Sequence, residues 1–421
     1  MPVRPLSAVD AQTYWMSAKI PNDTVLLFGF AGVPAQLEVA IEEIAARACG
    51  CPDLTVRVDD AGFLTYPVWV DREVDRSMFA VHDLEDRSFQ GCLDRVRELT
   101  APRLDARAAA WRLHVFTDVE GMPNTVGPGT VAVLQISHAL GGGGRTSVPA
   151  AIMFGRRDGV VPGIDAVGAG PISLPVMGFR AARAHRRLVD DTDAGRVPPP
   201  ADPRPVLRTN DRPEGARHLR TVMRRRSDLS GATVTVAVLS AVSVALADQL
   251  RSLGDDPSHL GAEVPMAKQP PRLAYNHFGN VGVGLYPDLA ESDRVVRIAA
   301  DLEARRRRAA HPAMQMADLA FAATPAPLLR WGMDRFDPGV RVPRVTGNTV
   351  VSSVNCGAAD FDFGGAPVTF ACAFPGLSPM MGLTHAVCGI GDTVAISVHA
   401  AESAIGDIDA YVDRLDAALP R

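Results

Sequence analysis

Hydrophobic and polar residues follow two different periods along this chain, and segments of the two kinds interleave from one end to the other. Short apolar or alternating stretches bounded by glycine, proline or charged residues predict β-strands. The predicted strands are Thr24–Phe30, Leu64–Val70, Trp111–Asp118, Thr130–His138, Val281–Leu285, Thr349–Val354, Val368–Phe374 and Thr393–Ala400. Apolar residues three or four positions apart predict amphipathic helices. The predicted helices are Ala35–Ala48, Phe89–Thr100, Ala232–Leu250, Asp293–Ala309 and Ile408–Leu419. This interleaving predicts an α/β (α+β) protein.

The pattern is interrupted once, near the middle of the chain. Residues 187–217 contain six prolines, several acidic residues and few large apolar ones. Such a composition predicts an exposed connection between two folded parts. We therefore expect an N-terminal lobe at residues 1–186, a crossover linker at 187–217 and a C-terminal lobe at 218–421.

Composition agrees with this organisation and limits the partners. The chain has 421 residues, of which 47% are hydrophobic and 22% charged, as in folded globular proteins of more than one domain. A net charge of −5 gives no general attraction for polyanions. We interpret the basic clusters Arg224–Arg226 and Arg305–Arg308 as solvated helix faces; the alternatives are sites for nucleotide phosphates or anionic lipid headgroups. No aromatic residues interleave with them, so no nucleic-acid partner is predicted.

The cysteines and the N-terminus bear on the compartment. None of the six cysteines forms a CxxC pair, and no histidine lies at zinc-ligand spacing, so no metal site is predicted. Scattered cysteines and an N-terminus without an apolar segment favour the cytoplasm. The most apolar window, Val234–Ala247, is too short to cross a bilayer and predicts a buried helix. Any membrane contact is therefore expected to be peripheral.

Candidate chemistry centres on one histidine. The chain has no GxSxG, HExxH or Walker motif, and Gly141–Gly144 do not complete a GxGxxG pattern. His138 ends the predicted half-buried strand Thr130–His138 and precedes these glycines, which permit close approach of a ligand. That position is typical of a general base, whose near-neutral pKa lets it accept a hydroxyl proton. A structural histidine beside a flexible loop fits the same residues, and the pattern leaves both interpretations open.

The segment SHALGGG, Ser137–Gly143, resembles the HHxxxDG motif of the bacterial wax ester synthase/diacylglycerol acyltransferase (WS/DGAT) family. The same motif marks the wider chloramphenicol acetyltransferase-like superfamily. In this alignment His138 takes the place of the catalytic histidine and Ser137 that of the first histidine. Gly142 replaces the acid, and Gly143 is the closing glycine.

Further segments resemble the same family in the same order, over nearly the whole chain. They are RPLSAVDAQTYW (Arg4–Trp15), which is similar to the family's PLSxxD start, PVWV (Pro67–Val70), LTAPRLDARAAAW (Leu99–Trp111), GATVTVAVL (Gly231–Leu239) and GNTVVSSVNCG (Gly347–Gly357). The tail Pro379–Asp413 resembles the family's closing pattern of strand, strand and helix. The resemblance implies two chloramphenicol acetyltransferase-like lobes, with mixed sheets flanked by helices, that meet along a channel.

The resemblance also implies an O-acyltransferase. Acyl-CoA would be the co-substrate, with no permanently bound cofactor, and the acceptor would be diacylglycerol, a long-chain alcohol or a related lipid hydroxyl at a membrane or lipid-droplet surface. Oxyanion donors would be backbone N–H groups of Gly141–Gly143 and the hydroxyl of Ser352, for which a backbone-bonded strand serine is the alternative. His385 falls where the family lines its channel; a packed histidine is the alternative.

Loss of the motif acid at Gly142 keeps two other functions open. One is a catalytically impaired relative that binds a lipid or a partner protein. The other is an acyltransferase of specialised lipid or polyketide synthesis that takes its acyl group from a carrier protein, with Arg305–Arg308 as the docking patch.

Overall fold

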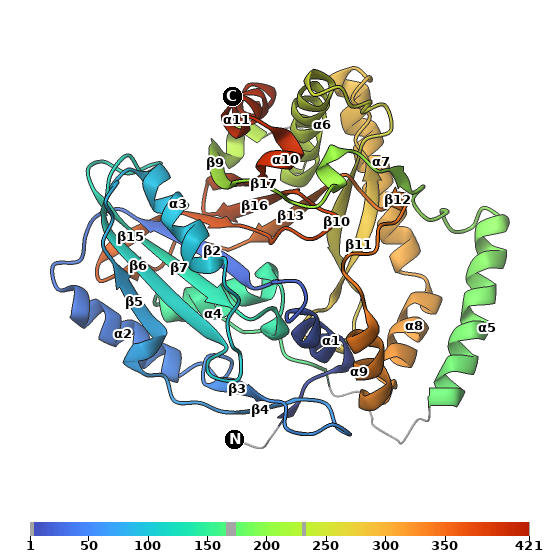
Figure 1. Cartoon of the computed structure of the whole chain (residues 1–421), viewed down its shortest axis with the longest axis horizontal. Coiled ribbons are helices and arrows are strands. Elements are labelled where there is room, and N and C mark those ends of the chain that lie inside the picture. Colours follow the sequence, from blue (N-terminus) through green and yellow to red (C-terminus); the bar gives the residue numbers. More distant parts are fainter. Residues whose placement is uncertain (1–3, 166–173, 230–232, 421) are drawn as a thin grey trace.

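The computed structural model describes residues 4–165, 174–229 and 233–420 and contains two six-stranded mixed sheets that lie side by side (Figure 1). The first sheet has the order β14 (Asp362–Phe363), β15 (Ala366–Ala373), β2 (Thr24–Phe30), β7 (Gly129–Ile136), β6 (Trp111–Val119) and β5 (Phe79–His82). The second has the order β11 (Phe278–Gly284), β10 (Gly261–Ala267), β13 (Thr349–Asn355), β16 (Leu383–Ile390), β17 (Thr393–Ala401) and β9 (Arg217–Arg225). Both sheets combine parallel and antiparallel pairs. The predicted fold class is therefore confirmed.

Helices cover both faces of the first sheet. Helices α2 (Leu37–Cys49) and α4 (Gly143–Met153) share one hydrophobic cluster with alternate residues of β7, and α3 (Phe89–Thr100) shares another with the remaining residues. Every residue of β7 is consequently buried, whereas the sequence predicted a half-buried strand. The strand also ends at Ile136, so His138 lies beyond it. The fully apolar run of β7 is what a strand with two covered faces requires.

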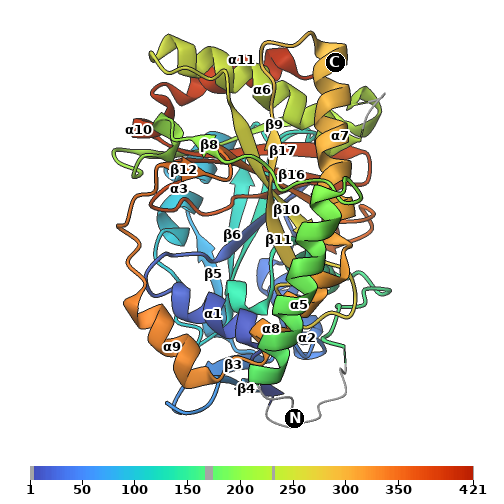
Figure 2. The same cartoon turned by 90° about the vertical axis from the view of Figure 1, so that its right-hand side faces the viewer.

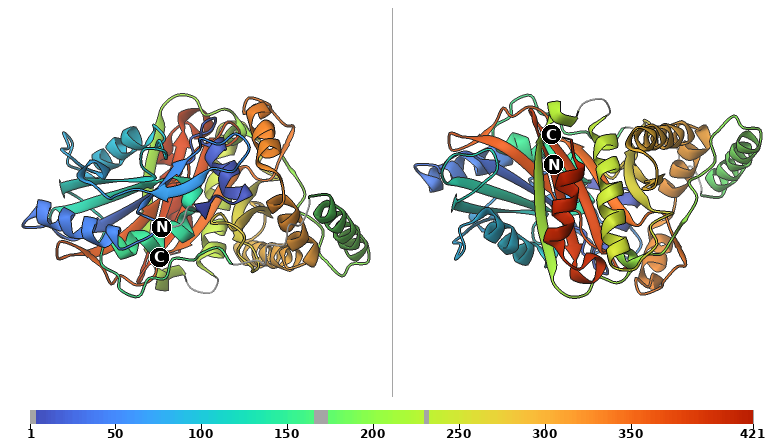
Figure 3. Two further views of the ribbon diagram at one scale, coloured as in Figure 1. Left: turned by 90° about the horizontal axis from the view of Figure 1, so that it is seen from below. Right: turned by 90° about the horizontal axis from the view of Figure 1, so that it is seen from above.

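The second sheet has its own core. Helices α6 (Val234–Ser252), α7 (Glu291–Ala309) and α11 (Ile408–Ala418) pack with one face of this sheet, and α6 and α11 lie across it in Figure 3. Among the described helices α6 alone is long and apolar enough to cross a membrane, but 72% of its apolar window is buried inside the protein. It is thus the buried helix that the sequence predicted, although the predicted start at Ala232 lies outside the described residues.

One segment from the C-terminal half of the chain adds strands to the first sheet. Between β13 and β16 the chain leaves the second sheet, adds β14 and β15 to the edge of the first, and returns. This excursion falls within residues 218–421, the predicted C-terminal lobe. The predicted linker at 187–217 begins inside α5 (Leu174–Asp193) and continues to the start of β9 as mostly irregular chain, interrupted by a two-residue strand at Arg204–Pro205 and a 3₁₀ turn at Arg208–Asn210.

The remaining elements join the lobes at one side and at the base. Helix α5 packs on α8 (Pro312–Ala322), and α1 (Ala8–Met16) packs on α9 (Ala326–Arg335), at the end of the molecule opposite α6 and α11 (Figure 2). The small strands and the last short helix are β1 (Arg4–Pro5), β3 (Val56–Asp59), β4 (Val68–Asp71), β8 (Arg204–Pro205), β12 (Arg344–Val345) and α10 (Glu402–Ile405). The strand predicted at Leu64–Val70 begins only at Val68, since Leu64 is 76% exposed in a loop.

The structure corrects one of the two basic clusters. Arg224 and Arg225 end strand β9 rather than lying on a helix, and Arg224 forms an ion pair of 2.8 Å with Asp416. The second cluster lies on helix α7, as predicted. There Arg305 and Arg308 donate to the carbonyl oxygens of Pro199 and Pro198.

Candidate active site

His138 lies at the turn that directly follows the buried strand β7. The strand is held through Ile136 by β2 and β6, and the Ser137 N–H donates to the Ala110 carbonyl at 2.8 Å. A short 3₁₀ turn, His138–Leu140, then redirects the chain toward helix α4. The Ser137 hydroxyl accepts from the Ala139 N–H at the start of this turn. Ser137 therefore serves as the cap of this turn.

The turn faces a cavity of about 490 Å³ between the lobes. His138 and the glycines 142–144 line it from the first lobe, and Phe278 and Ser352 line it from the second. His138 thus borders open space where the two sheets meet. The predicted base, the predicted glycines 142 and 143 and Ser352 are brought together by the fold.

The environment of the His138 ring differs between its two nitrogens. Nδ1 is buried and has no hydrogen-bond partner among the described residues, and the same is true of the nearby Asn276 amide oxygen. On the other edge, Cε1 and Nε2 lie 3.7 and 3.8 Å from where a side chain on Gly142 would begin. Burial lowers the pKa of His138 below 6.5, and polar interactions with its own backbone and with Asn276 oppose that shift. The ring is therefore neutral near pH 7, as a base must be.

A carboxylate near the N-terminus, that of Asp10, supports this turn through residues of the second lobe. Asp10 accepts the backbone N–H groups of Tyr275 and Asn276, at 2.9 Å each, and the Asn276 side-chain amide at 3.0 Å. The same Asn276 amide donates to the His138 carbonyl at 2.8 Å. Burial raises the pKa of Asp10, and these hydrogen bonds counteract the shift. Asp10 is the acid of the PLSxxD resemblance, and the structure links it through Asn276 to the candidate base.

A buried ion pair braces the same turn from behind. The Arg145 guanidinium forms a 2.6 Å ion pair with Asp53 and donates to the carbonyls of Leu140 and Pro162. It also lies 3.7 Å from the centre of the Tyr275 ring. The glycine run therefore has an anchor, although Gly142 lacks the motif acid. Two acids from elsewhere, Asp10 and Asp53, hold the turn instead.

The glycines have different roles. Gly141 has φ of 114°, and a side chain there would begin 2.8 Å from Arg145 Cδ, so this position needs glycine. Its N–H donates to the His138 carbonyl at 3.0 Å, so Gly141 is removed from the predicted oxyanion donors. Gly142 caps helix α4, and the first N–H groups of this helix, from Gly143 onward, have no partner within it. These N–H groups lie at the cavity wall and can stabilise negative charge there.

Strand β13 supplies the facing wall. Ser352 lines the cavity together with Val350 and Val354, its neighbours on the same face of the strand. The described residues provide no hydrogen-bond partner for the Ser352 hydroxyl, so the backbone-bonded alternative does not hold. Ser353 also borders the cavity, but its hydroxyl lies 2.9 Å from that of Thr235. Ser352 is thus the free hydroxyl opposite His138.

His385 does not line the cavity, and the predicted channel role is corrected. On strand β16 its neighbours Thr384 and Ala386 face the cavity, so alternation turns His385 the other way. It is fully buried, with Nε2 at 2.7 Å from the Tyr411 hydroxyl and Nδ1 at 3.0 Å from the Thr349 hydroxyl. Burial lowers its pKa to about 4. The packed alternative describes this histidine.

The sequence did not identify the residues that support the base. Asp10 carried a signal in the PLSxxD segment, but its partner, Asn276, lies more than half the chain away. Asp53 and Arg145 carried no motif signal, since single acidic and basic residues outside any recognised motif are common. Within the described residues no group of three or more His, Cys, Asp or Glu side chains is arranged to hold a metal ion.

Comparison with known proteins adds the family. Residues 276–421 match the WS/DGAT C-terminal domain. The resemblance to WS/DGAT proteins seen in the sequence is thereby confirmed. No curated protein sequence matches the chain.

Solved structures extend the likeness to WS/DGAT over the whole chain. The wax ester synthase/diacylglycerol acyltransferase from Marinobacter aquaeolei VT8 superposes with a TM-score of 0.64 at 18% identity, covering 98% of this chain and 97% of that one. The first condensation domain of the CDA synthetase superposes with a TM-score of 0.58 at 16% identity, covering 99% of this chain and 96% of that one. The starter condensation domain of rhizomide synthetase, in complex with C8-CoA and Leu-SNAC, superposes with a TM-score of 0.57 at 13% identity. The match covers 98% of this chain and 92% of that one. At these identities the likeness establishes the two-lobed acyltransferase fold.

Proposed function

We propose that this protein transfers an acyl group from a thioester, such as acyl-CoA, to an alcohol, with His138 as the general base. The observation that carries the proposal is the position of the neutral His138 ring, whose Nε2 edge borders the cavity between the lobes. A histidine packed among apolar side chains could not meet a substrate. The WS/DGAT domain and fold support acyl transfer as the class of reaction.

The chemistry needs one base and a place for transient negative charge. The alcohol O–H donates to Nε2 of His138, which takes the proton as the oxygen attacks the thioester carbonyl carbon. The tetrahedral oxyanion is stabilised by the Ser352 hydroxyl and by N–H groups at the start of α4. Collapse of this intermediate breaks the C–S bond, and the departing sulfur recovers the proton from the imidazolium. The products are an ester and a thiol, and no acyl-enzyme forms.

The nature of the cavity wall favours an acceptor with an apolar body. Pro162, Pro265, Ala267 and Phe278 line the cavity together with the polar residues Arg272, His277 and Asn280. Apolar surface of this kind gains free energy when it covers a hydrocarbon chain. A long-chain alcohol or diacylglycerol fits this description and is our proposed acceptor class.

The test is thiol release from a panel of acyl-CoAs with several alcohols. We expect His138→Ala to lower the rate at least about a hundredfold, because a positioned base contributes that much. The control is His259→Ala, since His259 is exposed in a turn far from the cavity. In the wild type, kcat/KM should fall as the pH drops through the pKa of His138, and burial places that fall below pH 6.5. Equal ester formation by wild type and His138→Ala would remove His138 from the reaction.

A further inference from the structure

A second cavity, of about 280 Å³, adjoins the one that contains His138. Its outer walls are helix α3, the chain between residues 212 and 219, and the loop after β15. The two cavities share a common wall that includes Pro21, Asp23, Val25, Phe374, Gly376 and Leu377. The two cavities are therefore neighbours, and a ligand arm that runs along these shared residues extends from the second cavity into the active-site cavity.

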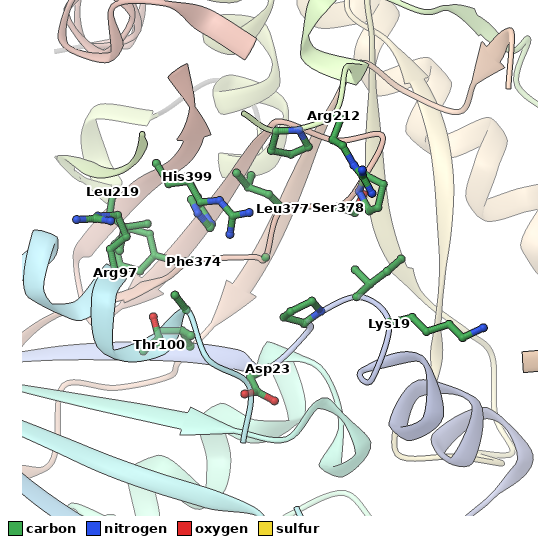
Figure 4. A pocket seen from close by; sticks show the side chains of 18 residues that line it. Lys19, Asp23, Arg97, Thr100, Arg212, Leu219, Phe374, Leu377, Ser378 and His399 are labelled. Atoms are coloured by element: carbon green, nitrogen blue, oxygen red, sulfur yellow. The ribbon is translucent and has the colours of Figure 1, made fainter. Parts of the chain in front are cut away.

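Arginine side chains from both lobes surround the second cavity. Figure 4 shows Arg97 and Thr100 projecting from α3 on one side and Arg212 from the linker on the other, with His399 between them. Arg217, at the start of β9, completes the basic set. Lys19 also borders the cavity, but it extends away in Figure 4 and donates to the carbonyls of Asp334 and Phe336.

These arginines lack the acidic partners that their neighbours have. On the same strand as Arg217, Arg220 pairs with Asp409 at 2.6 Å and Arg224 with Asp416 at 2.8 Å. Among the described residues the guanidinium groups of Arg212 and Arg217 have no ion-pair partner. Arg97 contacts only Glu98, at 3.3 Å, and its Nε atom is buried without a partner. A protein with a net charge of −5 thus keeps unpaired positive charge at this cavity.

We propose that this cavity binds the phosphate groups of a phosphopantetheine thioester and leads its acyl end to His138. Guanidinium groups bind phosphate oxygens through paired, charge-assisted hydrogen bonds. The uncharged pantetheine arm would pass Asp23, whose carboxylate is held by the Leu104 N–H and the Gln135 amide and can accept an amide N–H. The inference rests on the proposed function and adds which side of the protein the acyl donor uses.

The same chemistry has two sources, coenzyme A and a carrier protein, and the test separates them. The double variant Arg212→Gln/Arg217→Gln should raise KM about tenfold for acyl-CoA, with kcat unchanged, because the lost contacts act on binding alone. Acyl-pantetheine, which has no phosphate, should show the same KM in variant and wild type. The KM for an acyl-carrier protein should rise as much as the KM for acyl-CoA if the bound phosphate is the one that the two donors share. If the KM rises for acyl-CoA alone, the nucleotide phosphates are the bound groups.

The control removes the same charge elsewhere. Arg183→Gln/Arg186→Gln removes two exposed arginines from helix α5, which borders neither cavity, and should leave every KM unchanged. Equal KM changes for acyl-CoA and acyl-pantetheine in Arg212→Gln/Arg217→Gln would overturn the proposal, as would no change for either. A separate variant, Arg306→Gln/Arg307→Gln on helix α7, tests the alternative docking patch: a raised KM for the carrier-protein donor in this variant would place donor docking on α7 and would also overturn the proposal.

Binding of free coenzyme A, measured by calorimetry, tests the cavity without catalysis. We expect the double variant to bind about tenfold more weakly than wild type, and wild-type binding to weaken with salt. If coenzyme A binds through these arginines while His138→Ala retains full activity, the proposed function fails and the phosphate site stands. If His138→Ala is inactive while the arginine pair has no effect on binding, the phosphate site fails alone.

Discussion

Two adjacent serines on β13 differ in what their hydroxyl groups can do. Ser352 and Ser353 both border the active-site cavity, yet only the Ser353 hydroxyl has a partner, the hydroxyl of Thr235. A hydroxyl with no protein partner is free to donate to a substrate oxygen. At the scale of single residues, the proposed reaction therefore assigns oxyanion stabilisation by a side chain to Ser352 and not to Ser353.

Replacing the two serines in turn tests this difference. Ser352→Ala should lower kcat about a hundredfold with little change in KM, because the donor acts when the oxyanion forms. Ser353→Ala removes the same atom one position away and should change kcat by less than about threefold. Steady-state kinetics with one acyl-CoA and one alcohol measure both. Similar losses in the two variants would show that the strand, rather than the Ser352 hydroxyl, matters.

At the scale of elements, the turn between β7 and α4 shows how a glycine-rich segment can be kept rigid. Four consecutive glycines, 141–144, would be costly to order on their own. Arg145, on the first turn of α4, reaches back to the Leu140 carbonyl and is itself fixed by Asp53. The helix therefore anchors the turn that carries His138.

Removing the acid of this pair should loosen the turn. Asp53→Ala leaves the buried Arg145 charge uncompensated, and we expect unfolding to require about 3–5 kcal/mol less, with a lower kcat. The control is Asp360→Ala, which breaks the half-exposed pair with Arg156 and should cost about 1 kcal/mol or less. Urea unfolding and kcat at saturating substrate measure the two effects. Equal stability losses in the two variants would contradict the bracing role of Asp53.

At the scale of the whole molecule, buried histidines link stability to pH. Burial lowers the pKa of His114, His385 and His399 to about 4 each. In the unfolded chain each has a pKa of about 6.5. Between pH 6.5 and about pH 4, these histidines are therefore protonated in the unfolded chain but remain neutral in the folded chain. These three histidines therefore lower the free energy of unfolding as the pH falls over this interval.

The size of this fall is measurable. With three such histidines the free energy of unfolding should drop by up to about 4 kcal/mol per pH unit between pH 6 and 5. Urea unfolding at pH 7.5, 6 and 5 provides the values, and His114→Gln should remove about a third of the slope. A free energy of unfolding that does not change between pH 7.5 and 5 would contradict the burial of these rings as neutral groups.

The local pattern of the sequence located most elements but not their relationships. Strand Thr24–Phe30 and helix Phe89–Thr100 have the predicted bounds, because hydrophobic periodicity is set by each segment's own neighbours. Helix α4 was not predicted, since its glycine-rich start and Pro149 indicate a loop. Helix α5 and strands β9 and β10 were not assigned either, because charge or weak alternation conceals their period. Strand β16 was implied only by the resemblance of the tail to the family.

The sequence by itself determined many of the individual strands and helices, the likeness to WS/DGAT and the histidine that faces the cavity. Only the tertiary structure decided what surrounds that histidine, because Asp10 with Asn276 and Asp53 with Arg145 are far apart along the chain. It also decided that His385 faces the core and that β15 belongs to the first sheet. Contacts between distant segments depend on how whole layers pack, and no local period records that.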